Sequence, residues 1–220
     1  MNFTTSEENY IKSIYHLQQE TGTVNTNSLA AEMNTRPASV TDMLKKLKTK
    51  KLLQYERYKG FKLNDNGKKI ALGVVRKHRL WEFFLANKLG FEWDKVHAIA
   101  EELEHVSSNE LIERLEIFLG SPAFDPHGDP IPDSNGKIPQ LKQLNLLALP
   151  LNQTAVVSSV TNQTAQMLEM LKHYHIIIGT ALKVIKRFSF DGSMEIKVSK
   201  KAACIISEQV AKNVFVHHGK

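Results

Sequence analysis

Cysteine is almost missing from this sequence, which has a single one, Cys204, among its 220 residues. An internal disulfide is therefore excluded, and because Cys204 stands in the apolar run AACII, we expect a buried structural thiol rather than thiol chemistry. Long apolar runs are missing too, since none approaches the roughly 20 residues that cross a bilayer. The N-terminus MNFTTSEENY lacks the basic and apolar regions of a secretion signal. We expect a cytoplasmic protein with no membrane association.

Acidic residues are fewer than basic ones, since 23 Asp and Glu oppose 29 Lys and Arg and give a formal net charge of +6. A modest basic excess favours a polyanionic partner, although many proteins with such a charge bind none. The hydrophobic share of 42% is normal for a globular protein. The length allows one large domain or several small ones.

The N-terminal part has the pattern of a winged helix-turn-helix. Thr5 and Glu8 have the spacing of a capping box, which predicts a first helix that ends near Gly22. After the short segment SLAAEM, Pro37 suits the first turn of another helix, whose apolar residues repeat at i, i+4 and i+7: Val40, Leu44 and Leu47. The β-formers of LLQYERYKGFKL, on either side of Lys59-Gly60, then predict a hairpin.

The second of these helices has the surface of a DNA-reading helix. Its apolar face leaves small and hydrogen-bonding groups outward near the N-terminus, which suits base edges in a major groove, while basic residues suit phosphates. The candidate DNA-binding residues are Arg36, Pro37, Ala38, Ser39, Thr41, Asp42, Lys45 and Lys46, with Arg57 and Lys59 on the hairpin. A solvated charged face in a helical bundle and a protein-interaction module are the alternatives.

Three further helices and a β-rich region follow. A long helix from about residue 65, a second over residues 95–106 and a third that stops at Gly120 are predicted. Residues 121–140 hold five of the seven prolines and are expected to form a loop or linker. Beyond about residue 150, short alternating runs with Asp191-Gly192 as a hairpin turn predict a small β-rich domain.

Two of these helices carry residues of the kind that bind metals. In KVHAIAEELEHV, a polar sector is separated from the apolar arc and contains His97, Glu101, Glu104 and His105. His78 and Glu82 are one turn apart on the preceding helix. If the helices pack together, one set of three (His78, Glu82, His97) and a second (Glu101, Glu104, His105) each form a site.

Nitrogen and oxygen donors without thiolate suit Mn²⁺, Fe²⁺, Co²⁺ or Zn²⁺. The plain alternative is that each residue is an ordinary surface or core residue, but burying so many carboxylates without a cation would be costly.

At this point the sequence resembles the diphtheria toxin repressor and manganese transport regulator family over nearly its whole length. The stretches that carry the resemblance are EENYIKSIYHL, RPASVTDMLKKL, YERYKGFKLNDNGKKIA, RKHRLWEFFL, KVHAIAEELEHVSSNEL and DPHGDPIP. It implies a mainly α fold with β: a winged helix-turn-helix DNA-binding domain (1–73), a helical metal-binding and dimerisation domain (74–140), a linker (141–152) and an SH3-like, FeoA-like β-domain (153–220).

The resemblance also implies roles for single residues. His78, Glu82 and His97 correspond to the family's ancillary metal site, and Glu101, Glu104 and His105 to the primary, activating one. Asn9 stands where the first helix supplies a ligand, and Gln163 and Gln166 where the β-domain supplies two. Asp125 and Asp129 replace neutral residues of an anion site that includes the equivalent of Arg79, which disfavours an anion there. Glutamate rather than cysteine at position 101 favours Mn²⁺, with Fe²⁺ as the alternative and Zn²⁺, Co²⁺ or Ni²⁺ as substitutes.

The resulting hypothesis is a metal-dependent repressor without enzyme activity or an organic cofactor. Metal binding would select the homodimer geometry whose recognition helices fit successive major grooves of double-stranded operator DNA and so repress metal-uptake genes. A carboxylate-bridged di-metal enzyme is one alternative, for which Glu102 and His105 supply only one of the two Glu-x-x-His pairs required. The other is a winged-helix regulator that senses a small organic ligand.

Overall fold

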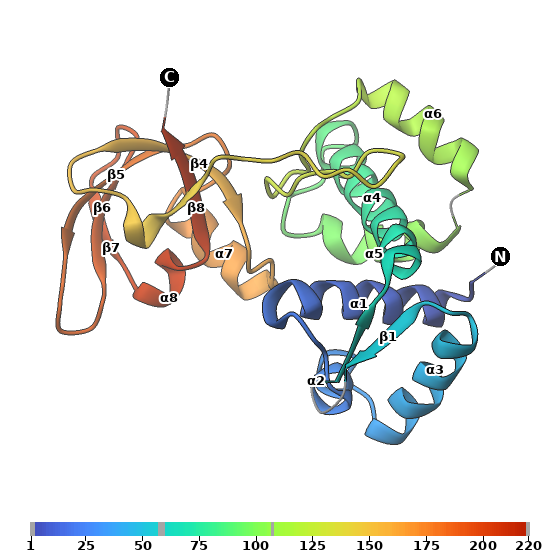
Figure 1. Cartoon of the computed structure of the whole chain (residues 1–220). Helices are drawn as coiled ribbons and strands as arrows, with labels where there is room; N and C mark the ends of the chain where they lie inside the picture. Colours follow the sequence, from blue (N-terminus) through green and yellow to red (C-terminus); the bar gives the residue numbers. More distant parts are fainter. Residues whose placement is uncertain (1–2, 57–59, 107, 219–220) are drawn as a thin grey trace. The chain divides into compact units, whose positions relative to one another are not determined.

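The computed structural model describes residues 3–56, 60–106 and 108–218 of the chain, which form two compact units (Figure 1). Unit 1 comprises Met1–His78, Glu102–Ile112 and Pro132–Ile138, and unit 2 comprises Arg79–Glu101, Glu113–Ile131 and Pro139–Lys220. The boundary between the units therefore falls inside three helices.

Unit 1 contains the predicted winged helix-turn-helix, which the structure confirms. Its elements are α1 (Thr5–Thr21), α2 (Thr26–Glu32), α3 (Pro37–Thr49), β1 (Leu53–Glu56) and β2 (Gly60–Leu63). The two strands form an antiparallel ladder from the Leu53–Leu63 pair to the Glu56–Gly60 pair. The core contains fully buried apolar side chains from every element except β1, among them Ile11, Ile14, Leu29, Leu47 and Leu63.

The start of α1 differs from the prediction by one residue. Thr4, not Thr5, is the N-cap, and it forms the capping box with Glu7. The prediction that Glu8 closes this box was wrong. Glu8 lies one position further along the helix and makes a different contact, which is described below.

Glycine is required where the wing meets the rest of unit 1. Gly60 has φ +116°, and a Cβ atom there would lie 2.2 Å from the carbonyl oxygen of Val24. Val24 and Phe61 exchange two backbone hydrogen bonds of 2.8 and 2.9 Å, so the strand is held against the segment before α2. Only glycine has both the conformational freedom and the small size for this approach. The predicted turn of the hairpin, residues 57–59, lies outside the described residues.

Three helices form the middle of the chain, as predicted. They are α4 (Asp65–Asn87), α5 (Val96–Val106) and α6 (Asn109–Leu119), and α6 is followed directly by Gly120, which has φ +78°. Of the helices in the described part of the chain, none combines the length and apolar character that crossing a membrane requires.

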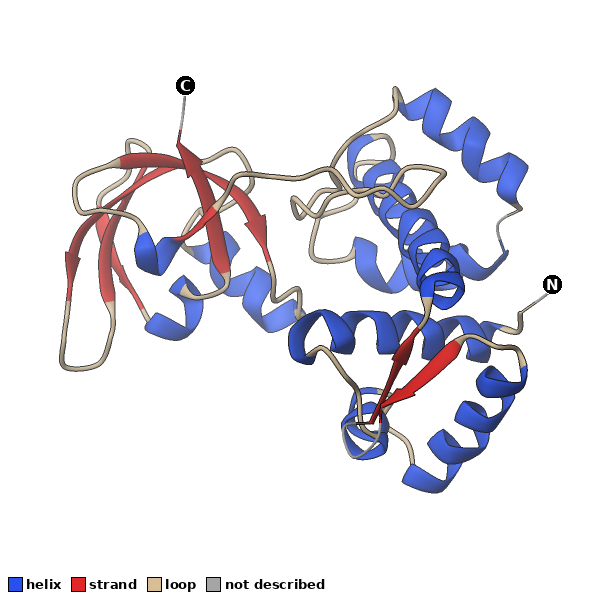
Figure 2. Ribbon diagram, in the orientation of Figure 1, coloured by secondary structure: helices blue, strands red, loops and turns tan. Residues whose placement is uncertain are grey.

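The C-terminal part of unit 2 is the expected SH3-like β-domain (Figure 2). Its antiparallel sheet has the order β3-β8-β4-β5-β6-β7. The elements, including one 3₁₀ helix, are β3 (Leu144–Asn145), η1 (Leu146–Ala148), β4 (Thr154–Val160), α7 (Ala165–His173), β5 (Ala181–Arg187), β6 (Met194–Val198), β7 (Ala203–Ile206), α8 (Glu208–Ala211) and β8 (Val214–His218). Strands and helices share one core, with Val157, Leu168, Ile196 and Val216 buried in it.

A proline-rich loop is fixed against this sheet within unit 2. Gly128 has φ +84°, and a Cβ atom there would lie 1.9 Å from the carbonyl oxygen of Ser158 on β4. The backbone N–H of Val160 donates to the carbonyl of His127 at 3.0 Å. This docking gives the side chains of residues 125–129 defined positions.

Candidate functional site

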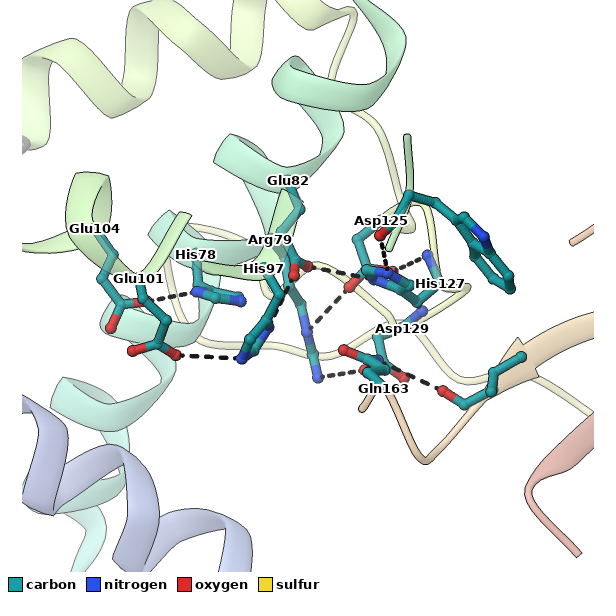
Figure 3. A network of polar contacts seen from close by, with 12 residues as sticks. His78, Arg79, Glu82, His97, Glu101, Glu104, Asp125, His127, Asp129 and Gln163 are labelled. Atoms are coloured by element: carbon teal, nitrogen blue, oxygen red, sulfur yellow. Dashed lines mark hydrogen bonds and ion pairs between the residues drawn. The ribbon is translucent and has the colours of Figure 1, made fainter. Parts of the chain in front are cut away.

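Glu104 is the centre of a polar cluster in unit 1. Its carboxylate is completely buried, although α5 is otherwise an amphipathic helix. Oε2 lies 2.7 Å from Nδ1 of His78 on α4 (Figure 3), and Oε1 lies 2.7 Å from the ammonium nitrogen of Lys12 on α1. A buried carboxylate needs such partners, because leaving it uncompensated would cost several kcal/mol (about 3–5 when one partner is removed).

His105 has one ring nitrogen engaged and one directed into the cluster. Nδ1 lies 2.7 Å from Oε2 of Glu8. Nε2 is buried without a hydrogen-bond partner among the described residues, yet it lies 3.2 Å from Oε1 of Glu104. A carboxylate that accepts the N–H of one ring nitrogen leaves the other with its lone pair available, which is how metal-bound histidines are usually held.

Asn9 adds a further unsatisfied acceptor in unit 1. Its Oδ1 is buried and has no hydrogen-bond partner among the described residues. Buried acceptors without a donor are rare and need an explanation. The carboxylate and imidazole donors of the Glu104 cluster fit a divalent cation of intermediate or hard character, and the amide oxygen of Asn9 on α1 is a donor of the same kind.

A second cluster lies in unit 2 around Glu82, whose side chain is 1% exposed. Oε1 of Glu82 lies 3.1 Å from Nδ1 of His97, and Nε2 of His97 lies 3.6 Å from Oε1 of Glu101 (Figure 3). The His97 side chain is about half exposed. It therefore connects a buried carboxylate with a partly exposed one.

Glu82 also faces two residues of the proline-rich loop. Ligand atoms of Glu82, Asp125 and His127 all lie within 4.8 Å of one another, and all three residues are buried. Nε2 of His127 lies 2.8 Å from the carbonyl oxygen of Trp93, which can only accept, so this nitrogen carries the proton. Nδ1 of His127 and Oδ2 of Asp125 have no hydrogen-bond partner among the described residues. Nδ1 of His127 lies 3.7 Å from Oε2 of Glu82, and Oδ2 of Asp125 lies 3.6 Å from Nε of Arg79. Two carboxylates and an imidazole gathered in this way are a donor set that fits a divalent cation.

The electrostatics of this second cluster show an excess of negative charge. Burial, followed by the carboxylates of Asp129 and Glu82, raises the pKa of Asp125 to about 8, despite the opposing effects of Arg79 and His127. Burial lowers the pKa of His127, but its contacts with Glu82 and Asp125 outweigh this effect, and the net pKa is raised. Both directions mean that protons compensate charge here when no metal does.

The other predicted ligands lie as follows. Glu101, Glu104 and His105 are within about one turn of α5. His78 and Glu82 are four residues apart on α4 and share a helix face. Gln163 donates from Nε2 to Oδ2 of Asp129 at 2.9 Å in unit 2, and Gln166 is exposed on α7.

Sequence reasoning missed four residues that contribute to these clusters: Glu8, Lys12, Asp125 and His127. Glu8 was assigned to the helix cap. The sequence analysis treats Asp125 only as a replacement in a possible anion site. In the structure, Arg79 contacts Asp125 and Asp129 at 3.6 and 3.3 Å. The stretch DPHGDPIP, which holds acid, imidazole and acid in five residues, was the available signal.

The candidate DNA-reading surface is exposed to solvent. The eight predicted residues that the structure describes are all exposed, namely Arg36, Pro37, Ala38, Ser39, Thr41, Asp42, Lys45 and Lys46. Val40, Leu44 and Leu47 hold the opposite face of α3 in the core. Lys45 pairs with Asp42 at 3.0 Å. Arg57 and Lys59 lie outside the described residues.

Comparison with known protein families finds three matching models. The iron dependent repressor N-terminal DNA-binding domain matches residues 2–61, the iron dependent repressor metal-binding and dimerisation domain matches residues 64–133, and the FeoA domain matches residues 144–218.

Curated relatives include the iron-dependent repressor IdeR of Mycobacterium tuberculosis and of Mycobacterium leprae. Each is 33% identical over 125 residues, which cover 57% of this chain and 54% of the relative. The chain thus spans about half the length of these relatives.

Solved structures match over more of the chain. A manganese-dependent transcriptional repressor in complex with manganese has a TM-score of 0.86 at 32% identity, over 96% of this chain and 98% of that one. A structure of ScaR with bound Cd²⁺ has a TM-score of 0.82 at 28% identity, over 96% and 99%. The manganese regulator SloR has a TM-score of 0.78 at 28% identity, over 97% and 98%.

Proposed function

The chain belongs to the diphtheria toxin repressor and manganese transport regulator family, and from this premise we propose that it is a divalent-metal-dependent transcriptional repressor that binds operator DNA as a homodimer. The observation that carries the proposal is the buried Glu104 cluster. It joins α1, the first helix of the DNA-binding module, to α4 and α5 through donors that suit a metal, all within unit 1.

The activating metal site is built on Glu104 and His105. Asn9 contributes its amide oxygen from α1, and His78 contributes an imidazole from α4. The sequence predicts Glu101 as a further ligand. The support for this set is that Nε2 of His105 and Oδ1 of Asn9 are buried and have no hydrogen-bond partner in the part of the chain that the structure describes. A bound cation would supply positive charge that links α1 to α5, which ties the orientation of the DNA module to metal occupancy.

A second metal site is centred on Glu82. The sequence predicts His78 and His97 as its partners, with Gln163 and Gln166 from the β-domain. Asp125 and His127 have stronger support in the structure, because both are buried and have ligand atoms within 4.8 Å of a ligand atom of Glu82. We therefore place the second metal between these three residues, with His97 and Gln163 at its margin.

Mn²⁺ or Fe²⁺ is the proposed metal. Carboxylate and imidazole donors without thiolate suit both ions. Relatives are named as iron-dependent and manganese-dependent repressors, and one neighbour's structure holds Cd²⁺. Zn²⁺, Co²⁺ and Ni²⁺ are expected to bind as substitutes.

Dimerisation and DNA binding complete the proposal. In unit 2, α6 exposes Ile117 at 75% and Phe118 at 64%, and such an apolar surface suits a second copy of the chain. The exposed face of α3 suits the major groove of operator DNA at metal-uptake genes.

The family models support the division into DNA-binding (1–73), metal-binding (74–140), linker (141–152) and β-domain (153–220) parts. A repressor must be in the same compartment as its operator DNA, so we also propose that the protein is cytoplasmic.

Neither alternative has a specific observation in its favour. The family is one of transcriptional repressors rather than enzymes. Glu102, which a di-metal enzyme would pair with His105, is exposed on α5.

The test compares two glutamates of α5 that are two positions apart, Glu104 and Glu102. Glu104→Ala should lose Mn²⁺-dependent binding to operator DNA by more than about tenfold, because it removes the central buried donor. Glu102→Ala is the matched control, and its metal-dependent DNA binding should equal that of the wild type. Calorimetry with Mn²⁺ and a gel-shift assay with and without the ion measure both properties. Unchanged metal-dependent DNA binding in Glu104→Ala would refute the proposed activating site.

A further inference from the structure

A lysine occupies the position of a counter-cation inside the Glu104 cluster. The ammonium nitrogen of Lys12 lies 2.7 Å from Oε1 of Glu104, and the two side chains are 12% and 0% exposed. Both residues belong to unit 1. The other oxygen of Glu104 is engaged by His78. Each carboxylate oxygen that a metal would use therefore has a partner, and one of these partners carries a full positive charge.

An ammonium group and a divalent cation compete at one carboxylate oxygen. The ammonium has three donors and no lone pair, so it cannot itself bind the metal. Two positive charges within contact distance of the same buried oxygen repel each other strongly where water does not screen them. Binding of a metal to Oε1 of Glu104 therefore favours the movement of Lys12 away from this oxygen.

We propose that Lys12 is a tethered competitor of the metal, which raises the metal concentration that the protein needs and is released from Glu104 when a divalent cation binds. This inference rests on the proposed function, in which Glu104 is a metal ligand. The lysine is on α1, three residues beyond Asn9 and four beyond Glu8, which contacts His105. The same helix thus presents a competitor and a histidine partner to one cluster, and it also carries Asn9, whose Oδ1 is buried without a hydrogen-bond partner among the described residues.

The exchange has a consequence for α1. Without metal, α1 is held to α5 by the Lys12–Glu104 and Glu8–His105 contacts. With metal, the first contact is lost, and a bond between Oδ1 of Asn9 and the cation replaces it. The lysine therefore makes the position of the first helix of the DNA module respond to occupancy of the site.

The first experiment measures Mn²⁺ affinity by calorimetry at one fixed pH. Lys12→Met keeps most of the aliphatic stem and removes the charge. Its affinity should rise by about tenfold if the wild-type pair is closed about nine times in ten, since the apparent affinity falls in proportion to the competent fraction. Lys12→Arg retains the charge and should bind Mn²⁺ no more tightly than the wild type.

The matched control is Lys50→Met. Lys50 also forms a 2.7 Å ion pair with a buried glutamate of α1, Glu7, but this pair belongs to the helix cap and not to the cluster. Its removal should leave Mn²⁺ affinity unchanged. Equal or weaker Mn²⁺ binding by Lys12→Met than by the wild type would overturn the inference.

A second experiment uses the wild-type chain and therefore does not depend on whether a variant folds. An amine-acylating reagent is applied with and without Mn²⁺, and the modified lysines are located by mass spectrometry. Lys12 should become several-fold more reactive with Mn²⁺, whereas Lys50 should not change. Equal labelling of Lys12 in both states, in a chain that binds Mn²⁺, contradicts the release of the lysine. If no Mn²⁺ binds to the wild type or to any variant, the proposed function itself fails.

Discussion

At the scale of single residues, the hydrogen bond at one nitrogen of a histidine decides what its other nitrogen does. Glu8 accepts from Nδ1 of His105, and the carbonyl of Trp93 accepts from Nε2 of His127. In each ring the remaining nitrogen is buried without a hydrogen-bond partner among the described residues and faces a carboxylate. An acidic or carbonyl partner thus selects the tautomer and directs the free lone pair to the place where a cation would lie.

The Glu82 cluster allows a substitution that changes charge and little else. Oδ1 of Asp125 accepts from the backbone N–H groups of His127 and Asp129 at 2.8 and 2.9 Å, and an asparagine oxygen accepts the same bonds. Asp125→Asn should lower by one the number of Mn²⁺ ions bound per chain in calorimetry, while binding that depends on Glu104 remains. Asp133→Asn, an exposed aspartate that also accepts from backbone N–H groups, is the control and should keep the wild-type number. An unchanged number in Asp125→Asn would place the second metal elsewhere.

The same variant should alter the stability of the metal-free protein. The folded chain holds the proton of Asp125 up to a pKa of about 8, whereas an unfolded chain releases it near 3.8. The contribution of Asp125 to the free energy of unfolding of the wild type therefore falls as the pH rises from 3.8 to 8, because the folded state disfavours the ionised carboxylate. Asparagine lacks this dependence, and its melting temperature relative to the wild type should rise over that range.

Sequence patterns could not identify every residue of these clusters, for physical reasons. Thr4 and Thr5 are adjacent, and each has a glutamate three positions later, so two capping boxes were equally consistent with the sequence. Because the sequence analysis assigned Glu8 to the capping box, it did not predict the contact between Glu8 and His105. Asp125 and His127 approach Glu82 from 43 and 45 residues further along the chain, by way of a loop docked on β4. Local periodicity carries no information about such long-range contacts.

At the scale of elements, the helices with a local sequence signal were predictable, and α7, which lacks one, was not. The 13 residues of α3 have one apolar face and a proline in the first turn, and this pattern gave the correct helix. In contrast, α7 has nine residues and no side-chain hydrogen bond at its N-cap, and it was missed. Its apolar face is buried against the sheet, so tertiary packing rather than a local signal defines it.

The exposed apolar face of α6 predicts how copies of the chain associate. Ile117 is 75% exposed, so its replacement by glutamate should leave the single chain folded but should place a charge in an apolar contact between copies. Ile117→Glu should therefore shift the protein from dimer to monomer in sedimentation experiments. Ile205→Glu, at a site that is 56% exposed on β7, is the control and should remain dimeric. A dimer of unchanged stability in Ile117→Glu would mean that another surface forms the interface.

At the scale of the whole molecule, the net charge of +6 and the proposed twofold assembly act together on DNA. Each phosphate that a lysine neutralises releases counterions, and this makes affinity fall with salt. A dimer carries every substitution twice. A change at one exposed lysine of α3 should therefore alter the salt dependence by twice the effect of a single contact.

Lys46 is the residue on which this reasoning can be tested, because it is exposed on α3 and outside the Lys45–Asp42 ion pair. Lys46→Ala should weaken binding to specific and unrelated DNA by similar factors, and it should reduce the slope of log affinity against log salt by about 2, or about 0.9 for each of the two copies. Lys201→Ala, exposed in the β-domain, should keep the wild-type slope. A fall in slope of about 1 for Lys46→Ala would indicate that one recognition helix touches DNA, and no fall would indicate that α3 does not lie against phosphates. The salt dependence of DNA affinity, measured in saturating Mn²⁺, therefore gives the number of recognition helices that contact DNA.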